Sequence, residues 1–230
     1  MMEISESWRR QFPGAVIGIL VMRGARNPPM HGELEKLREK IELDLRARFF
    51  AGGKEALRTE PVVAAYRSYY KLFRKTYHVE LQLESVIWKD RRIPSRGALV
   101  QAMSMAELKN GLLTAGHDLA RVALPIRIDV GTGAESYISM GGEERVPRQG
   151  DMRISDAMGI ISSIIYGPDN RTAIGPETKD LLFTVYAPGG IGIERVRSHL
   201  EDLRRFVEVV APEAVTEELE TCFADQPGAG

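Results

Sequence analysis

The 230-residue sequence has a single cysteine, Cys222, and only four histidines, which are scattered along the chain. One cysteine excludes an intramolecular disulfide framework and is typical of a protein from a reducing compartment. None of the histidines has a cysteine partner at the spacing of metal ligands. We therefore expect no metal site and no cofactor.

Long hydrophobic runs are also lacking. The longest apolar segments, residues 15–22 and 159–166, fall far short of the about 20 residues that a membrane-spanning helix needs. The first residues lack the basic and then apolar order of a secretory signal. With 43% hydrophobic and 27% charged residues, the chain can still bury a full core. We expect a soluble, cytoplasmic protein with no membrane partner.

The net charge of −1 argues against a strongly basic nucleic-acid-binding protein, but the charges are unevenly distributed. Residues 61–96 contain eight basic and three acidic residues, whereas residues 200–230 contain two basic and eight acidic ones. A segment of charge +5 is a candidate surface for phosphate groups. The alternative is that these charges only keep an amphipathic helix in solution.

Hydrophobic periodicity predicts helices first, strands later and a helix last, which is typical of an α+β fold. We expect a buried strand at 14–23 and helices at 34–49, 61–73, 80–88, 95–108 and 193–207. Thr59 and Ser95 are expected caps of the helices that follow them. Strand-like runs, expected to form a mixed or antiparallel sheet, lie at 123–130, 136–140, 152–155, 159–166 and 181–186.

The order of predicted elements and the composition of the last residues divide the chain into three parts. Residues 1–58 are expected to form a strand–helix extension packed on the core, and residues 59–210 are expected to form the main domain, including the last helix. Residues 211–230 are acidic and contain glycine and proline, so we expect a disordered tail.

The segment 94–122 starts with Pro-Ser, continues as a short helix, and ends in a turn with Asp118, Leu119, Arg121 and Val122. Downstream follow a Gly141-Gly142 turn, a Gly150-Asp151 step and Glu177-Thr178-Lys179 before an apolar strand. In this order the chain resembles the B3/B4 domain of the phenylalanyl-tRNA synthetase beta chain, over residues 61–187. The resemblance implies a mixed α+β domain.

The resemblance also implies an activity, because in the synthetase this domain hydrolyses tRNA(Phe) wrongly charged with tyrosine. The family's asparagine falls on Ser104, its histidine on Ala115 and its glutamate near Asn170, so all three polar positions differ. His117, two places along, is the candidate replacement for the histidine. The alternative is that His117 packs in the core with its polar nitrogen satisfied by the backbone.

These considerations give three candidate functions. The first is a tRNA-associated protein that hydrolyses mischarged aminoacyl-tRNA in trans, the second is a non-catalytic module that binds tRNA or an amino acid, and the third is a small-molecule or protein-interaction domain that only shares the fold. No DNA partner is expected. The candidate catalytic residues are Ser104, His117 and Gln101; the candidate substrate-binding residues are Asn170, Gly141, Gly142 and Glu177; the candidate RNA-binding residues are Arg67, Lys71, Arg74, Lys75, Arg91, Arg92 and Arg96.

Overall fold

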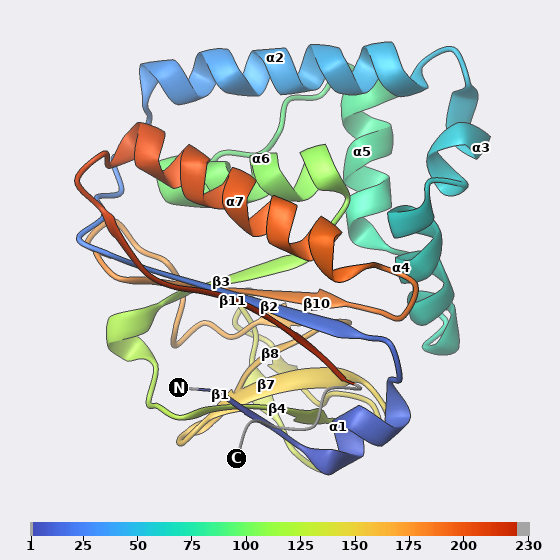
Figure 1. Cartoon of the computed structure of the whole chain (residues 1–230), viewed down its shortest axis with the longest axis vertical. Coiled ribbons are helices and arrows are strands. Elements are labelled where there is room, and N and C mark those ends of the chain that lie inside the picture. Colours follow the sequence, from blue (N-terminus) through green and yellow to red (C-terminus); the bar gives the residue numbers. More distant parts are fainter. Residues whose placement is uncertain (1, 225–230) are drawn as a thin grey trace.

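A computed structural model describes residues 2–224. The fold is α+β, with two stacked sheets, most of the helices on one outer face, and the short helix α1 (Glu6–Gln11) beside the five-stranded sheet (Figure 1). The four-stranded sheet lies in the middle of the molecule, with α2 (Gly32–Phe49), α6 (Ala98–Asn110) and α7 (Ile193–Val210) on one side and the five-stranded sheet on the other. Because both faces of the middle sheet are covered, three of its four strands, residues 16–23, 181–187 and 114–118, are almost wholly buried.

The middle sheet is antiparallel throughout, in the order β11 (Val215–Phe223), β2 (Val16–Arg23), β10 (Leu181–Ala187) and β3 (Thr114–Asp118). The five-stranded sheet has the order β1 (Met2–Ile4), β4 (Ile126–Val130), β7 (Met152–Asp156), β8 (Gly159–Ser163) and β9 (Gly167–Pro168), in which only β1 and β4 pair in parallel. A small hairpin joins β5 (Tyr137–Ile138) to β6 (Glu144–Arg145).

The remaining helices are α3 (Gly53–Arg58), α4 (Pro61–Leu72), α5 (His78–Trp88) and a 3₁₀ turn at Leu119–Arg121. Helices α3, α4 and α5 stand together at one end of α2 (Figure 1). Over residues 2–224, no helix is both long and apolar enough to cross a membrane.

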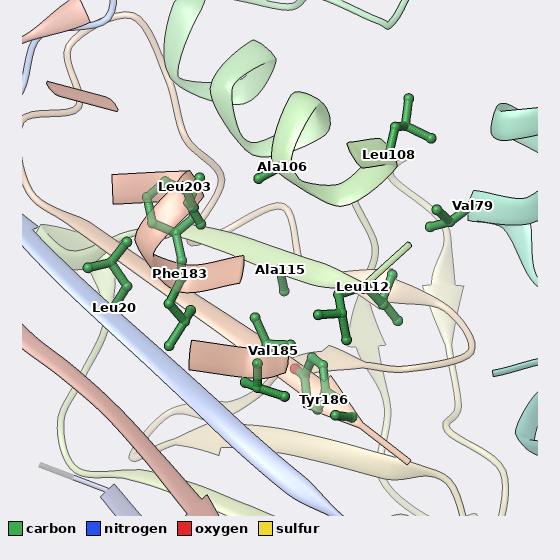
Figure 2. Close-up of a cluster of buried hydrophobic side chains, with 14 of the residues drawn as sticks. Leu20, Val79, Ala106, Leu108, Leu112, Ala115, Phe183, Val185, Tyr186 and Leu203 are labelled. Carbon is green, nitrogen blue, oxygen red and sulfur yellow. The ribbon is translucent and has the colours of Figure 1, made fainter. Parts of the chain in front are cut away.

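The core is continuous from the helices into the middle sheet. Figure 2 shows Leu20 and Phe183 of neighbouring strands, with Leu203 of α7 and Ala106 of α6 on the helical side. Gly18 of β2 permits this packing, because a Cβ there would lie 2.6 Å from Val196 Cγ1 of α7. The helix therefore lies closer to the sheet than any larger residue at position 18 would allow.

Two of the expected boundaries are wrong. The strand of the presumed N-terminal extension, β2, pairs with β10 and β11 in the middle of the sheet, so residues 1–58 include a central part of the core. The presumed disordered tail contains β11, an edge strand in which Leu219 and Phe223 pack against the core while Glu217 and Glu220 are exposed. Residues 225–230 of that tail lie outside the described part of the chain.

Two expected helix caps are also replaced. Thr59 Oγ1 donates to Glu55 O at 2.9 Å and so ends α3, while Glu60 occupies the N-cap position of α4. Gly97 is the N-cap residue of α6, and Ser95 instead donates to the side chain of Gln101. Strand β3, which sequence periodicity does not predict, occupies the segment between α6 and the 3₁₀ turn.

Candidate nucleic-acid interface

Helix α4 is held by three tyrosines on its buried face. Tyr66 Oη donates to Tyr186 O of β10 at 2.5 Å, Tyr69 Oη donates to Asp151 Oδ1 at 2.7 Å, and Tyr70 Oη donates to Ile164 O at 2.8 Å. Tyr69 and Tyr70 follow Tyr66 by three and four residues, so the three side chains share one face of the helix. The opposite face, with its basic residues, is thereby held in a fixed orientation at the surface.

A cavity of about 580 Å³ lies beside the basic face, between α3, α4 and α5. Three predicted RNA-binding residues, Arg67, Lys71 and Lys75, line it, and Arg58 of α3 adds a fourth cation. The other lining residues are Ala64, Ser68, Thr76, Tyr77, Glu80, Leu81 and Glu84. The cavity is within the size range of sites for small ligands or parts of larger ones.

The two carboxylates of this cavity are neutralised by ion pairs. Glu80 is only 2% exposed, and its Oε1 accepts hydrogen bonds from Arg58 Nε at 3.2 Å and from Arg67 Nη1. Glu84 accepts a hydrogen bond from Lys54 Nζ at 2.6 Å. Because both carboxylates are buried and paired, they do little to repel an anion that enters the cavity.

The cations that remain are Lys71 and Lys75, neither of which forms an ion pair with a carboxylate of residues 2–224. Lys75 Nζ lies 5.8 Å from the centre of the Tyr166 ring. Lys75 is brought to the cavity because the residue before it, Arg74, adopts a left-handed backbone conformation (φ 55°) directly after α4. Lys75 N then bonds to Tyr70 O at 3.1 Å, which turns the chain back toward the cavity.

Of the other predicted RNA-binding residues, Arg74 is exposed just after α4 and does not line the cavity. Arg91, Arg92 and Arg96 form a second group. They lie in the loop after α5, whereas Lys75 lies just before this helix. Helix α5 has 11 residues, which makes it about 16 Å long. The loop is anchored where Ile93 N donates to the buried Glu42 Oε1 at 2.8 Å. The structure therefore separates the basic residues into a cavity group and a loop group at opposite ends of α5.

The predicted catalytic residues do not converge. Gln101 is fully buried, where its Nε2 donates to Glu35 Oε1 at 2.5 Å and its Oε1 accepts from Ser95 Oγ at 3.1 Å. Ser104 is buried in α6. Gly116 of β3 faces α6, since a Cβ there would lie 2.9 Å from Met103 Sδ of that helix. Successive residues of a strand point to opposite faces, so the side chain of His117 points away from α6.

His117 belongs instead to a buried chain of hydrogen bonds. Its Nδ1 lies 2.7 Å from Thr172 Oγ1, which donates to Asp169 Oδ1, so His117 Nδ1 carries the proton toward Thr172. The polar partner is thus a side chain rather than the backbone. Burial lowers the pKa of His117 to about 4, which keeps the ring neutral at pH 7.

The predicted substrate-binding residues are exposed. Asn170 N donates to Ile138 O at 3.0 Å, which brings this residue next to the β5–β6 hairpin whose turn contains Gly141 and Gly142. Glu177 lies in a different turn, closed where Gly175 N donates to Thr178 Oγ1 at 2.9 Å. Ala115, on which the family's histidine falls, is buried in β3.

Sequence reasoning missed Arg58 and the part that Glu80 and Glu84 play in the cavity. Arg58 precedes the basic segment and lies on a different helix, so no spacing along α4 indicates it. The two glutamates do have a signal, since they recur four residues apart on α5 and share one face. Among residues 2–224, no group of three or more histidine, cysteine, aspartate or glutamate side chains could hold a metal ion.

No protein-family model and no curated protein matches this chain. Among solved structures, it is similar to the crystal structure of an N-terminal fragment of the phenylalanyl-tRNA synthetase beta-subunit from Pyrococcus horikoshii. The TM-score is 0.48 and the sequence identity is 12%, and the match covers 95% of this chain. The chain spans 54% of that fragment's length. Similarity at this level assigns no activity or substrate.

Proposed function

We propose that this protein binds RNA through its phosphate groups, with the cavity between α3, α4 and α5 as the principal contact. The supporting observation is that Lys71 and Lys75 line a cavity of about 580 Å³ without a carboxylate partner among the described residues. Ammonium groups in this position neutralise phosphates and release counterions, which favours binding of a polyanion. tRNA is the proposed RNA because of the sequence resemblance over residues 61–187.

The arrangement favours a binding module over a deacylase. Ester hydrolysis requires a base, a held water and oxyanion donors around one carbonyl. The candidates for these roles, Gln101, Ser104 and His117, are buried, and His117 lies on the face of β3 opposite to α6. A single substrate ester therefore cannot contact Ser104 and His117 together in this conformation.

The proposal is tested by measuring the affinity for unfractionated tRNA over a range of salt concentrations. Lys71→Glu combined with Lys75→Glu should weaken binding about tenfold or more. The slope of log K against log salt concentration should also become shallower by about one for each phosphate that is no longer neutralised. Arg197→Glu combined with Arg205→Glu makes the same two charge reversals on the exposed face of α7, outside the cavity lining, and is the matched control. Equally weakened binding in both variants, or wild-type binding that salt does not weaken, would rule out the cavity as the RNA site.

A further inference from the structure

A second cavity, of about 540 Å³, lies on the other side of α4. It is open to solvent and is bordered by α1, α4 and three loops, and its lining is mainly apolar, unlike that of the basic cavity. The lining residues are Gln11, Phe12, Pro13, Ala65, Ser68, Tyr69, Leu72, Phe73, Gln149, Gly150, Pro188 and Gly189. Nothing in the proposed phosphate contacts uses this cavity.

The cavity combines aromatic rings with an uncovered aliphatic side chain. The Phe12 ring centre lies 5.9 Å from that of Tyr69, which in turn lies 5.2 Å from that of Phe73. Leu72 projects from the last turn of α4 and is 75% exposed. A leucine this exposed on a helix whose other large apolar residues are buried leaves apolar surface available to a ligand.

Two glutamine side chains accompany this apolar surface. Gln11 Nε2 donates to Gly150 O at 3.1 Å, and Gln149 is exposed beside it. An amide group both donates and accepts hydrogen bonds, as the edges of nucleobases do. The cavity thus offers apolar contact for a planar ring and polar groups for the edge of that ring.

The two cavities share one residue, Ser68, which is exposed on α4. Residues 64, 67 and 71 of the helix face the basic cavity, and residues 65, 69 and 72 face the apolar one. A strand that places phosphates at Lys71 and Lys75 therefore has only the ridge at Ser68 to cross before it reaches the apolar cavity. This is the combination of basic groove and stacking surface by which proteins bind single strands.

We infer that the apolar cavity takes the base of an unpaired nucleotide of the RNA whose phosphates bind in the basic cavity. The inference rests on the proposed function, and it specifies that function further, because it requires a single-stranded rather than a duplex segment. The base would stack on Phe12 and pack against Leu72, and Gln11 and Gln149 would contact its edge. Stacking of this kind tolerates any base sequence.

The test compares binding of a short single-stranded oligoadenylate with that of an abasic oligoribonucleotide of equal length and charge. Wild-type protein should bind the intact strand about tenfold more tightly, and Leu72→Ser should remove most of this difference without changing the salt dependence. Leu43→Ser is the matched control, because Leu43 is 63% exposed on α2, away from both cavities. A 2-aminopurine in the strand should lose fluorescence on binding to wild-type protein and retain it with Leu72→Ser.

The outcomes separate the inference from the proposed function. If both strands bind equally and both weaken with Lys71→Glu and Lys75→Glu, the phosphate site stands and the base site is overturned. If neither strand nor tRNA binds, both proposals fail. If the base-dependent difference survives Leu72→Ser but tRNA binding still needs the lysines, the base lies elsewhere and the assignment of this cavity is wrong.

Discussion

Tyr69 of α4 and Asp151, directly before β7, form a buried pair in which the Tyr69 hydroxyl donates to the carboxylate at 2.7 Å. The same hydroxyl accepts a hydrogen bond from Met152 N at 2.6 Å. One side chain thus satisfies a carboxylate and a backbone amide of the five-stranded sheet. It also fixes the helix that separates the basic cavity from the apolar one.

Replacing Tyr69 with phenylalanine should destabilise the protein. The substitution leaves a buried carboxylate without this donor and a buried amide without its acceptor, which costs about 2–4 kcal/mol in the free energy of unfolding. Urea denaturation of Tyr69→Phe and wild-type protein measures the difference. Ser85→Ala is the control, since Ser85 Oγ makes only an exposed bond to Leu81 O within α5. A destabilisation no larger than that of the control would contradict this account.

The importance of α4 could be predicted from sequence only in part. The recurrence of Tyr66, Tyr69 and Tyr70 indicates a buried face, and the recurrence of Arg67 and Lys71 indicates a charged one. Arg67 forms an ion pair with Glu80, which lies on another helix, whereas Lys71 has no carboxylate partner among the described residues. Pairing between helices is a property of tertiary packing, so no spacing within the sequence predicts it.

Two strands show why local patterns were insufficient for the sheet. Strand β3 contains Thr114, Ala115 and Gly116, whose small side chains give no hydrophobic alternation although both faces are buried. Strand β11 lies at an edge, where exposed glutamates are compatible with pairing and discourage association with other chains. Its acidic composition therefore resembles that of a disordered tail. By contrast, the aliphatic run of β2 predicts its burial correctly.

Glu107 should make the stability of the protein fall as the pH rises. Burial raises the pKa of its carboxyl to about 8, while Thr114 N donates to it at 2.9 Å. Since the folded-state pKa lies above the ordinary value of 4.5, the stabilisation is fully present below pH 4.5 and is lost as the pH rises through 8. By pH 7 the loss amounts to about 3 kcal/mol.

The test is Glu107→Gln, which retains an oxygen acceptor for Thr114 N and removes the titration. The variant should gain stability relative to wild type between pH 5 and pH 8, as measured by urea denaturation at each pH. Parallel stability curves for the two proteins would show that folding does not raise the pKa of the Glu107 carboxyl.

Two buried histidines, His117 and His199, should make the stability of the protein fall as the pH becomes acidic. Burial lowers the pKa of both His117 and His199 to about 4. His199 Nε2 bonds to Thr114 Oγ1 at 2.8 Å, and its Nδ1 accepts from Asn110 Nδ2 at 3.2 Å, so the ring is neutral. Lys109 and Asp202 face the same cluster and are paired with each other at 2.8 Å.

Because these folded-state pKa values lie below the ordinary value of 6.5, each histidine contributes stability that is present above pH 6.5 and lost as the pH falls through 4. The expected loss is about 3 kcal/mol per histidine at pH 4. Titration of the two imidazole proton resonances by NMR gives the pKa values directly. A resonance that titrates near pH 6.5 in folded protein would show that the ring is accessible to water.

Deacylation of mischarged tRNA is the measurement that separates a binding module from an editing enzyme. Purified protein should release no amino acid from a panel of correctly and wrongly charged tRNAs, including tyrosine on tRNA(Phe), under conditions in which it binds them. Ser104 and His117 lie on different sides of β3, so neither Ser104→Ala nor His117→Ala should change this result.

Release from one mischarged tRNA that both substitutions abolish would require a conformation in which these two side chains meet, and it would restore the hydrolytic hypothesis. Release that survives both substitutions but disappears in Lys71→Glu would instead place an ester-hydrolysing site beside the basic cavity.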